Sequence, residues 1–252
     1  MQVANLQGKK LLIVGGNGYV GSEVGRQALA LGAHVMSVSR SGKPKRNEPW
    51  NDQIEWIKGD ALTPASFEKK LEEADAVVHS LGTLIDTSFT RLSKPGQYGT
   101  YEHLNRETAR AIGAKLEQIG GNKKITYISA SKAPPFIKRY LTTKLEAENY
   151  LFGLKNVRAS VLRPGFIYSS APAATLINIY SDIFNGLFQF VKYDTALHKF
   201  LSNFDVDKAI KVEAVAVSAL YTSFDGSFDG KILYNKDMEA LYARFLADGF
   251  KI

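Results

Sequence analysis

The sequence of 252 residues contains no cysteine. This absence excludes disulfide bridges, thiol nucleophiles, zinc–thiolate sites and iron–sulfur clusters. The four histidines, at positions 34, 79, 103 and 198, lie far apart without the spacing of metal ligands, so no metal site is predicted. No run of 18 apolar residues occurs, which argues against a transmembrane helix.

Targeting signals are also missing from the N-terminus. Residues 1–5, MQVAN, lack the basic and apolar regions of a secretory signal peptide, and no clear mitochondrial presequence is visible. Hydrophobic residues make up 45% of the chain and charged residues 23%, a composition that excludes intrinsic disorder. The length fits a single large α/β domain.

Acidic residues are outnumbered, because 32 lysines and arginines face 25 aspartates and glutamates, a formal charge of +7. A basic protein of this size binds nucleic acid, anionic lipid or a phosphorylated cofactor. No nucleic-acid-binding motif occurs in the sequence, so the nucleic-acid class is not favoured.

Short apolar runs alternate with segments of helical periodicity over the first two-thirds of the chain. This rhythm predicts a Rossmann-type, doubly wound parallel sheet with right-handed crossovers. Strands are expected at residues 10–15, 34–40, 54–58, 76–80, 124–129 and 158–162, and helices at residues 20–31, 63–73, 101–119 and 140–152.

After residue 165 the rhythm changes. Residues 171–200 and 205–225 have helical patterns, residues 230–234 form a candidate late strand, and residues 237–248 a last helix. We therefore expect one domain over residues 1–252. Residues 1–170 form its dinucleotide-binding core, and residues 171–252 form a small, mostly helical substrate-side lobe with late core elements.

A glycine-rich segment, GGNGYVG at residues 15–21, follows the first strand and opens a helix. Glycine at 15, 18 and 21 permits a tight turn and lets a pyrophosphate approach the backbone, while the helix N-terminus attracts its charge. Within a strand–turn–helix this pattern is strong evidence for a dinucleotide. The predicted contacts in this segment are Gly15, Asn17, Gly18, Tyr19 and Val20.

The end of the second strand lacks a carboxylate. An acidic residue there would bind the ribose 2′-hydroxyl of NAD, whereas this chain has Ser39, Arg40 and Ser41, followed by further basic residues. An arginine suits a 2′-phosphate, so the predicted cofactor is NADPH/NADP+. Asp60, followed by Ala61, comes after the third strand. Its carboxylate either accepts a hydrogen bond from the adenine amine or begins a helix.

Several further motifs occur in order. VHSLG at 78–82, YEHLNRET at 101–108, YLTTK at 140–144 and LRPGFIY at 162–168 accompany the glycine loop. Together they resemble the extended or atypical short-chain dehydrogenases/reductases over nearly the whole chain. The resemblance implies cofactor contacts by Ser80, Leu81, Gly82, Asn105, Tyr140, Lys144, Pro164, Gly165 and Phe166.

Tyr140 and Lys144 are four residues apart and share one helix face. The ammonium and an oxidised nicotinamide are expected to lower the pKa of Tyr140, which then exchanges a proton with the substrate oxygen. Lys144 holds the ribose, and Ser129 or Ser131 hydrogen-bonds the carbonyl. The separations of 11 and 9 residues from Tyr140 are short for active members of the family. Two functions therefore stay open, an oxidoreductase and a subunit in which NADPH is structural.

A narrower resemblance links the chain to a fungal mitochondrial subset of the family. That subset is similar to the NADPH-binding accessory subunit of respiratory complex I and includes a protein of the coenzyme Q biosynthesis complex. It implies a location on the matrix side of the inner membrane, a carbonyl or quinonoid substrate of the quinone pathway, and a membrane-associated protein complex as partner.

One apolar stripe follows helical spacing from residue 176 to residue 191. We expect a helix packed on the core, with the wall of a quinone pocket or a partner-binding face as the alternatives. Direct membrane insertion is not favoured, because the polar face of that helix carries few basic residues. Peripheral membrane contact would use a basic patch of Lys132, Lys138 and Arg139.

Overall fold

The computed structural model describes residues 5–45, 47–83, 99–132, 138–169 and 209–250. A seven-stranded sheet in the order β3-β2-β1-β4-β5-β6-β9 forms its centre, and every pair of neighbouring strands is parallel. The strands are β1 (Lys10–Val14), β2 (His34–Ser39), β3 (Glu55–Lys58), β4 (Ala76–His79), β5 (Lys123–Ile128), β6 (Val157–Arg163) and β9 (Ile232–Tyr234).

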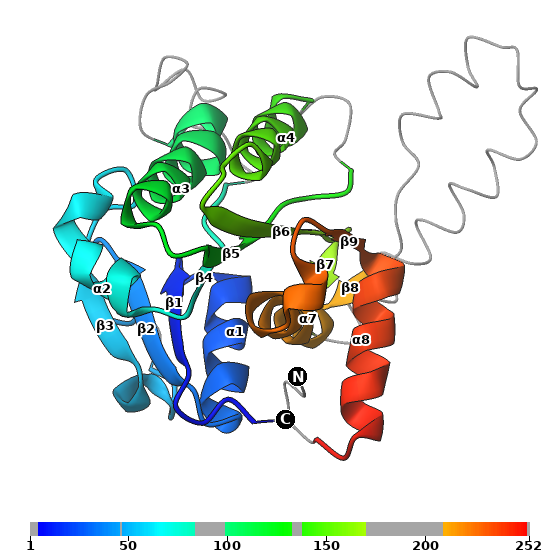
Figure 1. Ribbon diagram of the computed structural model, residues 1–252. Coiled ribbons are helices and arrows are strands. Elements are labelled where there is room, and N and C mark those ends of the chain that lie inside the picture. The colour runs from blue at the N-terminus through cyan, green and yellow to red at the C-terminus, as the bar shows by residue number, and fades with distance from the viewer. Residues whose placement is uncertain (1–4, 46, 84–98, 133–137, 170–208, 251–252) are drawn as a thin grey trace, which may run out of the picture.

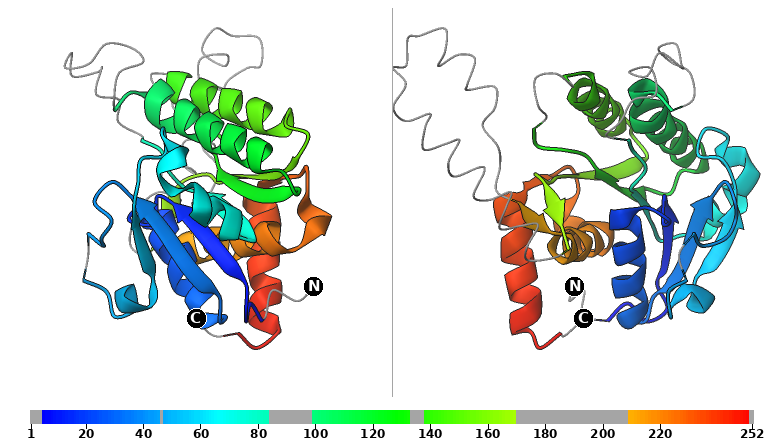
Figure 2. Two further views of the ribbon diagram at one scale, coloured as in Figure 1. Left: turned by 60° about the vertical axis from the view of Figure 1, so that its left-hand side comes forward. Right: turned by 180° about the vertical axis from the view of Figure 1, so that it is seen from behind.

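Helices cover both faces of this sheet (Figure 1). On one face lie α1 (Tyr19–Ala30), α7 (Val212–Phe224) and α8 (Asn235–Ala247), and on the other lie α2 (Glu68–Glu73), α3 (Thr108–Ile119) and α4 (Lys138–Phe152). The two further views in Figure 2 show the same three layers. The predicted Rossmann-type, doubly wound fold is thereby confirmed.

The sequence explains why the central strands are buried. The β1 segment, KLLIV, and the β4 segment, AVVH, are almost continuously apolar, as expected for strands covered on both faces. Leu11 and Ile13 point into the layer beneath α1 and α7, whereas Leu12 and Val14 point into the layer beneath α2 and α3. This alternation divides the core into two apolar clusters.

The last part of the described chain completes the sheet and its core. Helix α7 is apolar nearly all around, and every residue of it except Glu213 is buried, as expected for a helix enclosed by α1, α8 and the sheet. Strand β9 pairs with β6 at the edge of the sheet. Two-residue strands β7 (Ile167–Tyr168) and β8 (Ile210–Lys211) pair with each other.

Three predicted helices differ from the structure at their starts. The helix expected at 63–73 opens with a 3-10 helix, Pro64–Phe67, before α2. The helix expected at 205–225 begins only at Val212, because residues 210–211 form β8 instead. The helix expected at 101–119 opens with a π-helical segment, Glu102–Glu107, before α3. The apolar stripe at 176–191 lies outside the described residues.

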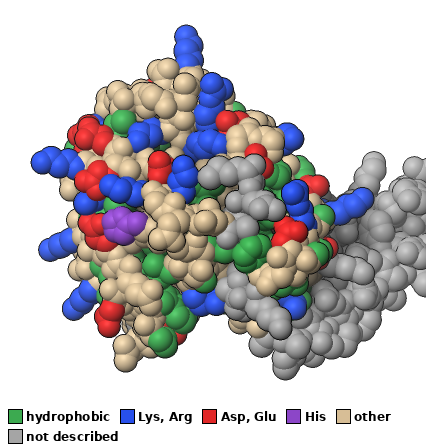
Figure 3. Space-filling model, turned by 60° about the horizontal axis from the view of Figure 1, so that its bottom comes forward, with side chains coloured by type: hydrophobic (Ala, Val, Ile, Leu, Met, Phe, Trp, Pro, Cys, Tyr) green, Lys and Arg blue, Asp and Glu red, His purple; other side chains and the backbone are tan. Residues whose placement is uncertain are grey.

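Within the described ranges, no helix is both long enough and apolar enough to cross a bilayer. The surface charges seen in Figure 3 are mixed, with Lys, Arg, Asp and Glu side chains interspersed over the face turned to the viewer. Among the described residues, Lys70 forms ion pairs with both Glu55 and Glu73. The basic excess therefore forms no continuous stripe on that face.

Candidate functional site

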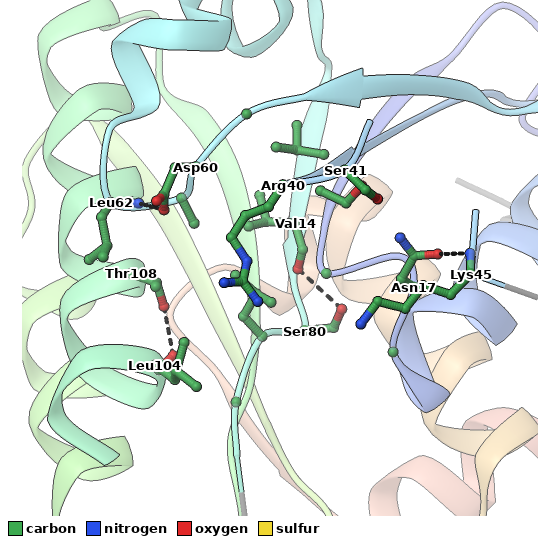
Figure 4. Close-up of a pocket in the computed structure, with 18 residues that line it drawn as sticks. Val14, Asn17, Arg40, Ser41, Lys45, Asp60, Leu62, Ser80, Leu104 and Thr108 are labelled. Carbon is green, nitrogen blue, oxygen red and sulfur yellow. Dashed lines mark hydrogen bonds between the residues drawn. The ribbon is translucent and has the colours of Figure 1, made fainter. Parts of the chain in front are cut away.

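A cavity of about 380 Å³ opens at the carboxyl ends of the central strands. The strand order reverses between β1 and β4, which makes this the point where doubly wound sheets bind ligands. The cavity wall comes from the ends of β1, β2, β3 and β4 and from the helix that carries Leu104 and Thr108 (Figure 4).

The glycine loop forms one end of this cavity. Gly15 has a φ of +103°, and a Cβ there would lie 3.0 Å from both the Leu81 nitrogen and the Ser80 Oγ. A Cβ at Gly21 would lie 2.5 Å from the Gly15 oxygen, so α1 can approach the loop only without a side chain there. Gly18 caps α1 without a side-chain hydrogen bond, and no acidic residue lies in the first turn of that helix. The backbone N–H groups and the positive end of the helix dipole are therefore suited to an anion.

The loop after β2 forms the neighbouring wall. Ser39, Arg40, Ser41 and Lys45 line the cavity there, and Figure 4 shows the Arg40 side chain extending across it. The amide of Asn17, from the glycine loop, hydrogen-bonds the Lys43 oxygen at 3.1 Å and the Lys45 nitrogen at 2.9 Å. The glycine loop and the basic loop are thus tied directly together.

The ends of β3 and β4 complete the wall. Asp60 lines the cavity, and one of its carboxylate oxygens accepts a 3.0 Å hydrogen bond from the Leu62 nitrogen. This contact lies in the turn before the helical segment that begins at Pro64, whose N-cap is Thr63, so Asp60 does not begin a helix, and it lines the cavity. The Ser80 hydroxyl donates to the Val14 oxygen at 3.2 Å, which joins β4 to β1 beside the glycine loop.

Asn105, Lys144 and Gly82 meet beside the cavity. A Cβ at Gly82 would lie 3.0 Å from Asn105 Oδ1 and 3.2 Å from Lys144 Nζ. Asn105 lies in the π-helical segment, where its side chain accepts from the Thr83 nitrogen at 2.8 Å and its backbone oxygen accepts from the Tyr127 hydroxyl at 2.7 Å. Such π-helical segments recur at functional sites.

The Lys144 ammonium is buried between two aromatic rings. It donates to the Ile128 oxygen at 2.8 Å and lies 5.1 Å from the centre of the Tyr127 ring and 5.7 Å from that of Tyr140. Burial lowers the pKa of Lys144 to about 8. Burial, reinforced by the charge of Lys144, also lowers the pKa of the neighbouring His79 to about 3, so this imidazole is neutral at physiological pH.

Tyr140 packs edge-on against Tyr101, with ring centres 5.8 Å apart. Burial raises the pKa of its hydroxyl to about 12. The sequence predicted a lowered value from the attraction of the ammonium and an oxidised nicotinamide together. Among the residues of the folded chain, the loss of hydration outweighs the attraction of the ammonium, and the Tyr140 hydroxyl is a neutral donor.

Ser129 and Ser131 have different surroundings. The Ser129 hydroxyl is buried and donates to the Glu148 carboxylate, which also binds the Arg163 guanidinium at 2.6 Å. Arg163 in turn donates to the Tyr234 hydroxyl at 2.7 Å. The Ser131 hydroxyl oxygen is buried and has no hydrogen-bond partner among the described residues.

The remaining predicted residues surround this site without lining the cavity. Tyr19 is exposed, and Val20 packs on the core at the start of α1. The Pro164 oxygen accepts from the Ser131 nitrogen at 3.0 Å, and the Gly165 nitrogen donates to Asn235 at 2.8 Å. Phe166 is 53% exposed. The residues after β6 are thus anchored to the Ser131 segment and to α8.

Eleven of the predicted cofactor contacts come together around the cavity. They are Gly15, Asn17, Gly18, Ser39, Arg40, Ser41, Asp60, Ala61, Ser80, Leu81 and Gly82. The sequence prediction did not include Val14, Val38, Lys45, Gly59, Leu62, Leu104 and Thr108, which also line it. Val14 and Val38 lie near the ends of predicted strands and Gly59 directly follows one, and this position was the signal that could have identified these three.

Three kinds of comparison agree with this architecture. A family model described as NAD(P)H-binding matches residues 15–183. MIOREX complex component 2 of Saccharomyces cerevisiae is 32% identical over 201 residues, which are 63% of this chain and 73% of the yeast protein. An uncharacterized chloroplastic protein of Arabidopsis thaliana is 31% identical over 184 residues, 66% of this chain and 53% of that protein.

Solved structures share the fold at low sequence identity. The Bordetella bronchiseptica enzyme WbmF, in complex with NAD+, has a TM-score of 0.60 and 16% identity, over 98% of this chain and 81% of that one. A short-chain type dehydrogenase/reductase from Mycobacterium ulcerans has a TM-score of 0.59 and 18% identity, over 93% and 91%. The family resemblance predicted from the motifs is confirmed. The chain belongs to the NAD(P)H-binding family and has the fold of the atypical short-chain dehydrogenases/reductases.

Proposed function

We propose that this protein binds NADP(H) and transfers a hydride between its nicotinamide and a carbonyl or quinonoid substrate. One observation carries the proposal. A glycine loop and a basic, carboxylate-free loop together line one cavity at the switch point of the sheet.

The residues around the cavity suit such a dinucleotide. Because Gly15 and Gly21 carry no side chains, the loop packs closely against β4 and α1, and the backbone of Gly15 and Gly18 lines the cavity where a pyrophosphate would bind. Arg40 and Lys45 offer cations for a 2′-phosphate, and Arg40 supplies the planar donor geometry that phosphate favours. This argument favours NADP(H) over NAD(H).

Tyr140, Lys144 and Asn105 would form the reacting end of the site. When bound, the dinucleotide supplies or accepts the hydride. Tyr140, protonated at neutral pH, donates its proton to the substrate oxygen as the carbonyl is reduced. Lys144 holds the ribose, and Asn105 fixes the turn that contains Gly82 and Thr83.

We assign the second hydrogen-bond donor to Ser131 rather than Ser129. A serine hydroxyl has one proton to donate, and Ser129 gives its proton to the Glu148 carboxylate, which can only accept. The Ser131 hydroxyl oxygen is buried two residues further along the chain, and it has no hydrogen-bond partner among the described residues. It can therefore donate to a substrate carbonyl.

A cofactor-binding subunit without turnover is the second candidate. Two observations favour it. The Ser129 hydroxyl already donates to Glu148, and the pKa of about 12 for Tyr140 disfavours loss of its proton to a substrate. The yeast relative is named as a component of a complex, which agrees with this role. With either function, we propose a mitochondrial, inner-membrane-associated setting in ubiquinone biosynthesis, from the motifs shared with the fungal subset.

The first experiment is a thermal-shift comparison of NADPH, NADP+, NADH and NAD+ at equal concentrations. A ligand present at a hundred times its dissociation constant stabilises the folded chain by about 2.7 kcal/mol. We expect this shift with NADPH and NADP+, and a smaller one with NADH and NAD+. Equal shifts with all four would contradict the 2′-phosphate assignment, and no shift with any would contradict nucleotide binding.

Turnover separates the two candidate functions. With quinone-pathway carbonyl compounds as substrates, Tyr140→Phe should lower kcat by about 10²–10⁴-fold while the Kd of NADPH stays near the wild-type value. Arg40→Ala should weaken NADPH binding instead. If NADPH binds wild-type protein but no substrate is turned over, the subunit function is favoured.

A further inference from the structure

Asn17 joins two loops that approach different parts of the cavity. Its Nδ2 donates to the Lys43 oxygen at 3.1 Å, and its Oδ1 accepts from the Lys45 nitrogen at 2.9 Å. Asn17 itself belongs to the glycine loop, between Gly15 and Gly18, whose backbone lines the proposed pyrophosphate end of the cavity. Figure 4 shows the Asn17 amide directed toward Lys45, with both side chains at the cavity.

The loop that Asn17 holds is strongly basic. Arg40, Lys43 and Lys45 lie within six residues, and their like charges repel one another. In the described part of the chain, Lys43 and Lys45 form no ion pair that would offset this repulsion. A fixed position for Lys45 at the cavity therefore depends on the uncharged contacts of the loop.

Those contacts converge on the Lys43 carbonyl. The Ser41 hydroxyl donates to it at 3.0 Å, beside the bond from Asn17. Gly42, with a φ of +65°, turns the chain against Lys58, and its nitrogen donates to Ser39 Oγ at 3.1 Å. Ser41 and Asn17 thus hold the Lys43 carbonyl from two sides, and Asn17 anchors it to the glycine loop.

We propose that Asn17 is a positioning residue for cofactor selectivity. It holds residues 43–45 so that the Lys45 ammonium faces the 2′-phosphate of NADP(H). Both polar atoms of its amide are engaged by the basic loop, so Asn17 acts through that loop rather than as a separate ligand contact. The inference rests on the proposed binding of NADP(H) at this cavity.

The test measures the Kd of NADPH and of NADH for the wild type, Asn17→Ala, Lys45→Ala and the double variant. Asn17→Ala should release Lys45 from the 2′-phosphate, and a hydrogen bond to such a charged group contributes roughly tenfold in affinity. The Kd of NADPH should therefore rise about tenfold and that of NADH, which lacks this phosphate, less than about threefold. The double variant should bind NADPH no more weakly than Lys45→Ala, because the two residues act together.

Two further variants support the comparison. Ser41→Ala removes the other bond to the Lys43 carbonyl and should shift selectivity in the same direction by less, which keeps the test valid if Asn17→Ala does not fold. Asn156→Ala is the matched control. It removes an exposed asparagine amide that contacts Glu117, and it should leave both dissociation constants unchanged.

Equal weakening of NADPH and NADH by Asn17→Ala would overturn the inference, because Asn17 would then serve only the pyrophosphate end. Additive effects of Asn17→Ala and Lys45→Ala would overturn it as well. Both results leave NADP(H) binding intact. A wild-type protein with no preference for NADPH would contradict the proposed function and the inference together.

Discussion

At the scale of single residues, burial separates two glutamates of α4 that each form an ion pair. Glu148 is 1% exposed and binds Ser129 and Arg163 at once, whereas Glu146, two residues earlier, pairs with Arg106 at the surface. Breaking a buried ion pair leaves a charge without hydration, but breaking a surface pair leaves both charges in water. Two glutamates on one helix therefore have very different importance for stability.

We predict that Glu148→Ala lowers the free energy of unfolding by about 3–5 kcal/mol, because it leaves the Arg163 guanidinium partly buried without its carboxylate. Glu146→Ala should lower it by about 1 kcal/mol or less. Urea unfolding monitored by far-UV circular dichroism measures both. Similar losses in the two variants would show that the Ser129–Glu148–Arg163 contacts contribute little.

Lys144 should make stability depend on pH. Its pKa is lowered from 10.5 to about 8 in the folded chain, so protonation disfavours folding. Between pH 8 and 10.5 the unfolded chain binds more protons, and the free energy of unfolding rises with pH, by about 3 kcal/mol in total. Below pH 8 Lys144 is protonated in both the folded and the unfolded chain, and the full free-energy cost of burying its ammonium remains.

Lys144→Met should remove this rise. We expect the stability difference between wild type and Lys144→Met to change by about 2–3 kcal/mol in favour of wild type from pH 7.5 to pH 10, measured by denaturant titration. Above pH 10 the raised pKa of Tyr140 reverses the slope, so the window ends there. Lys69→Met, on the exposed side of α2, is the control. If the difference in unfolding free energy between wild type and Lys144→Met stayed constant from pH 7.5 to pH 10, the lowered pKa of a buried Lys144 would be contradicted.

At the scale of elements, the close packing of α1 on the glycine loop positions one wall of the cavity. Two glycines of this helix have different surroundings. A Cβ at Gly21 would lie 2.5 Å from the Gly15 oxygen and the Ser80 Oγ, whereas a Cβ at Gly25 would make ordinary contacts of 3.4 Å or more with Ile54 and Ile13. Only the first position requires glycine for space.

Gly21→Ala should therefore lower the free energy of unfolding by about 1–3 kcal/mol and weaken nucleotide binding, since α1 must move away from the loop. Gly25→Ala should raise stability by about 0.5–1 kcal/mol, because alanine favours the helix. Thermal unfolding and the Kd of NADPH measure both effects. A neutral Gly21→Ala would show that α1 does not pack tightly on the loop.

At the scale of the whole molecule, residues 209–250 are part of the same core as the N-terminal half. Leu220, in α7, belongs to one apolar cluster with Ile13 and Val35 of the central strands. The two tryptophans, Trp50 and Trp56, lie at the β3 side of the molecule and report on the N-terminal half. These positions allow a test of the single-domain prediction.

Leu220→Ala should cost about 2–5 kcal/mol and lower the unfolding midpoint equally by tryptophan fluorescence and by circular dichroism. Leu246→Ala, at a residue that is 46% exposed, should change stability by about 0.5 kcal/mol or less. A fluorescence transition that stays at the wild-type midpoint in Leu220→Ala would show that the C-terminal part folds independently.

Local sequence determined the order of elements and the location of the dinucleotide end. A short apolar run such as LLIV, followed by glycines, is typical of a buried central strand, and glycines at 15, 18 and 21 suit one kind of turn, so these features follow from neighbouring residues alone. The alternation of strands and helices then determined the doubly wound fold, and with it the edge of the sheet where Arg40 and Asp60 would meet.

Tertiary structure decided the protonation and the partners of the reacting residues. Glu148 reaches Ser129 across 19 positions, and Asn17 reaches Lys45 across 28, contacts that no local pattern contains. The pKa of Tyr140 rises because surrounding elements exclude water from its hydroxyl, an effect that a four-residue spacing to Lys144 cannot reveal. Hydration and long-range hydrogen bonds depend on the assembled chain, and that is why the sequence located the site while only the fold assigned its chemistry.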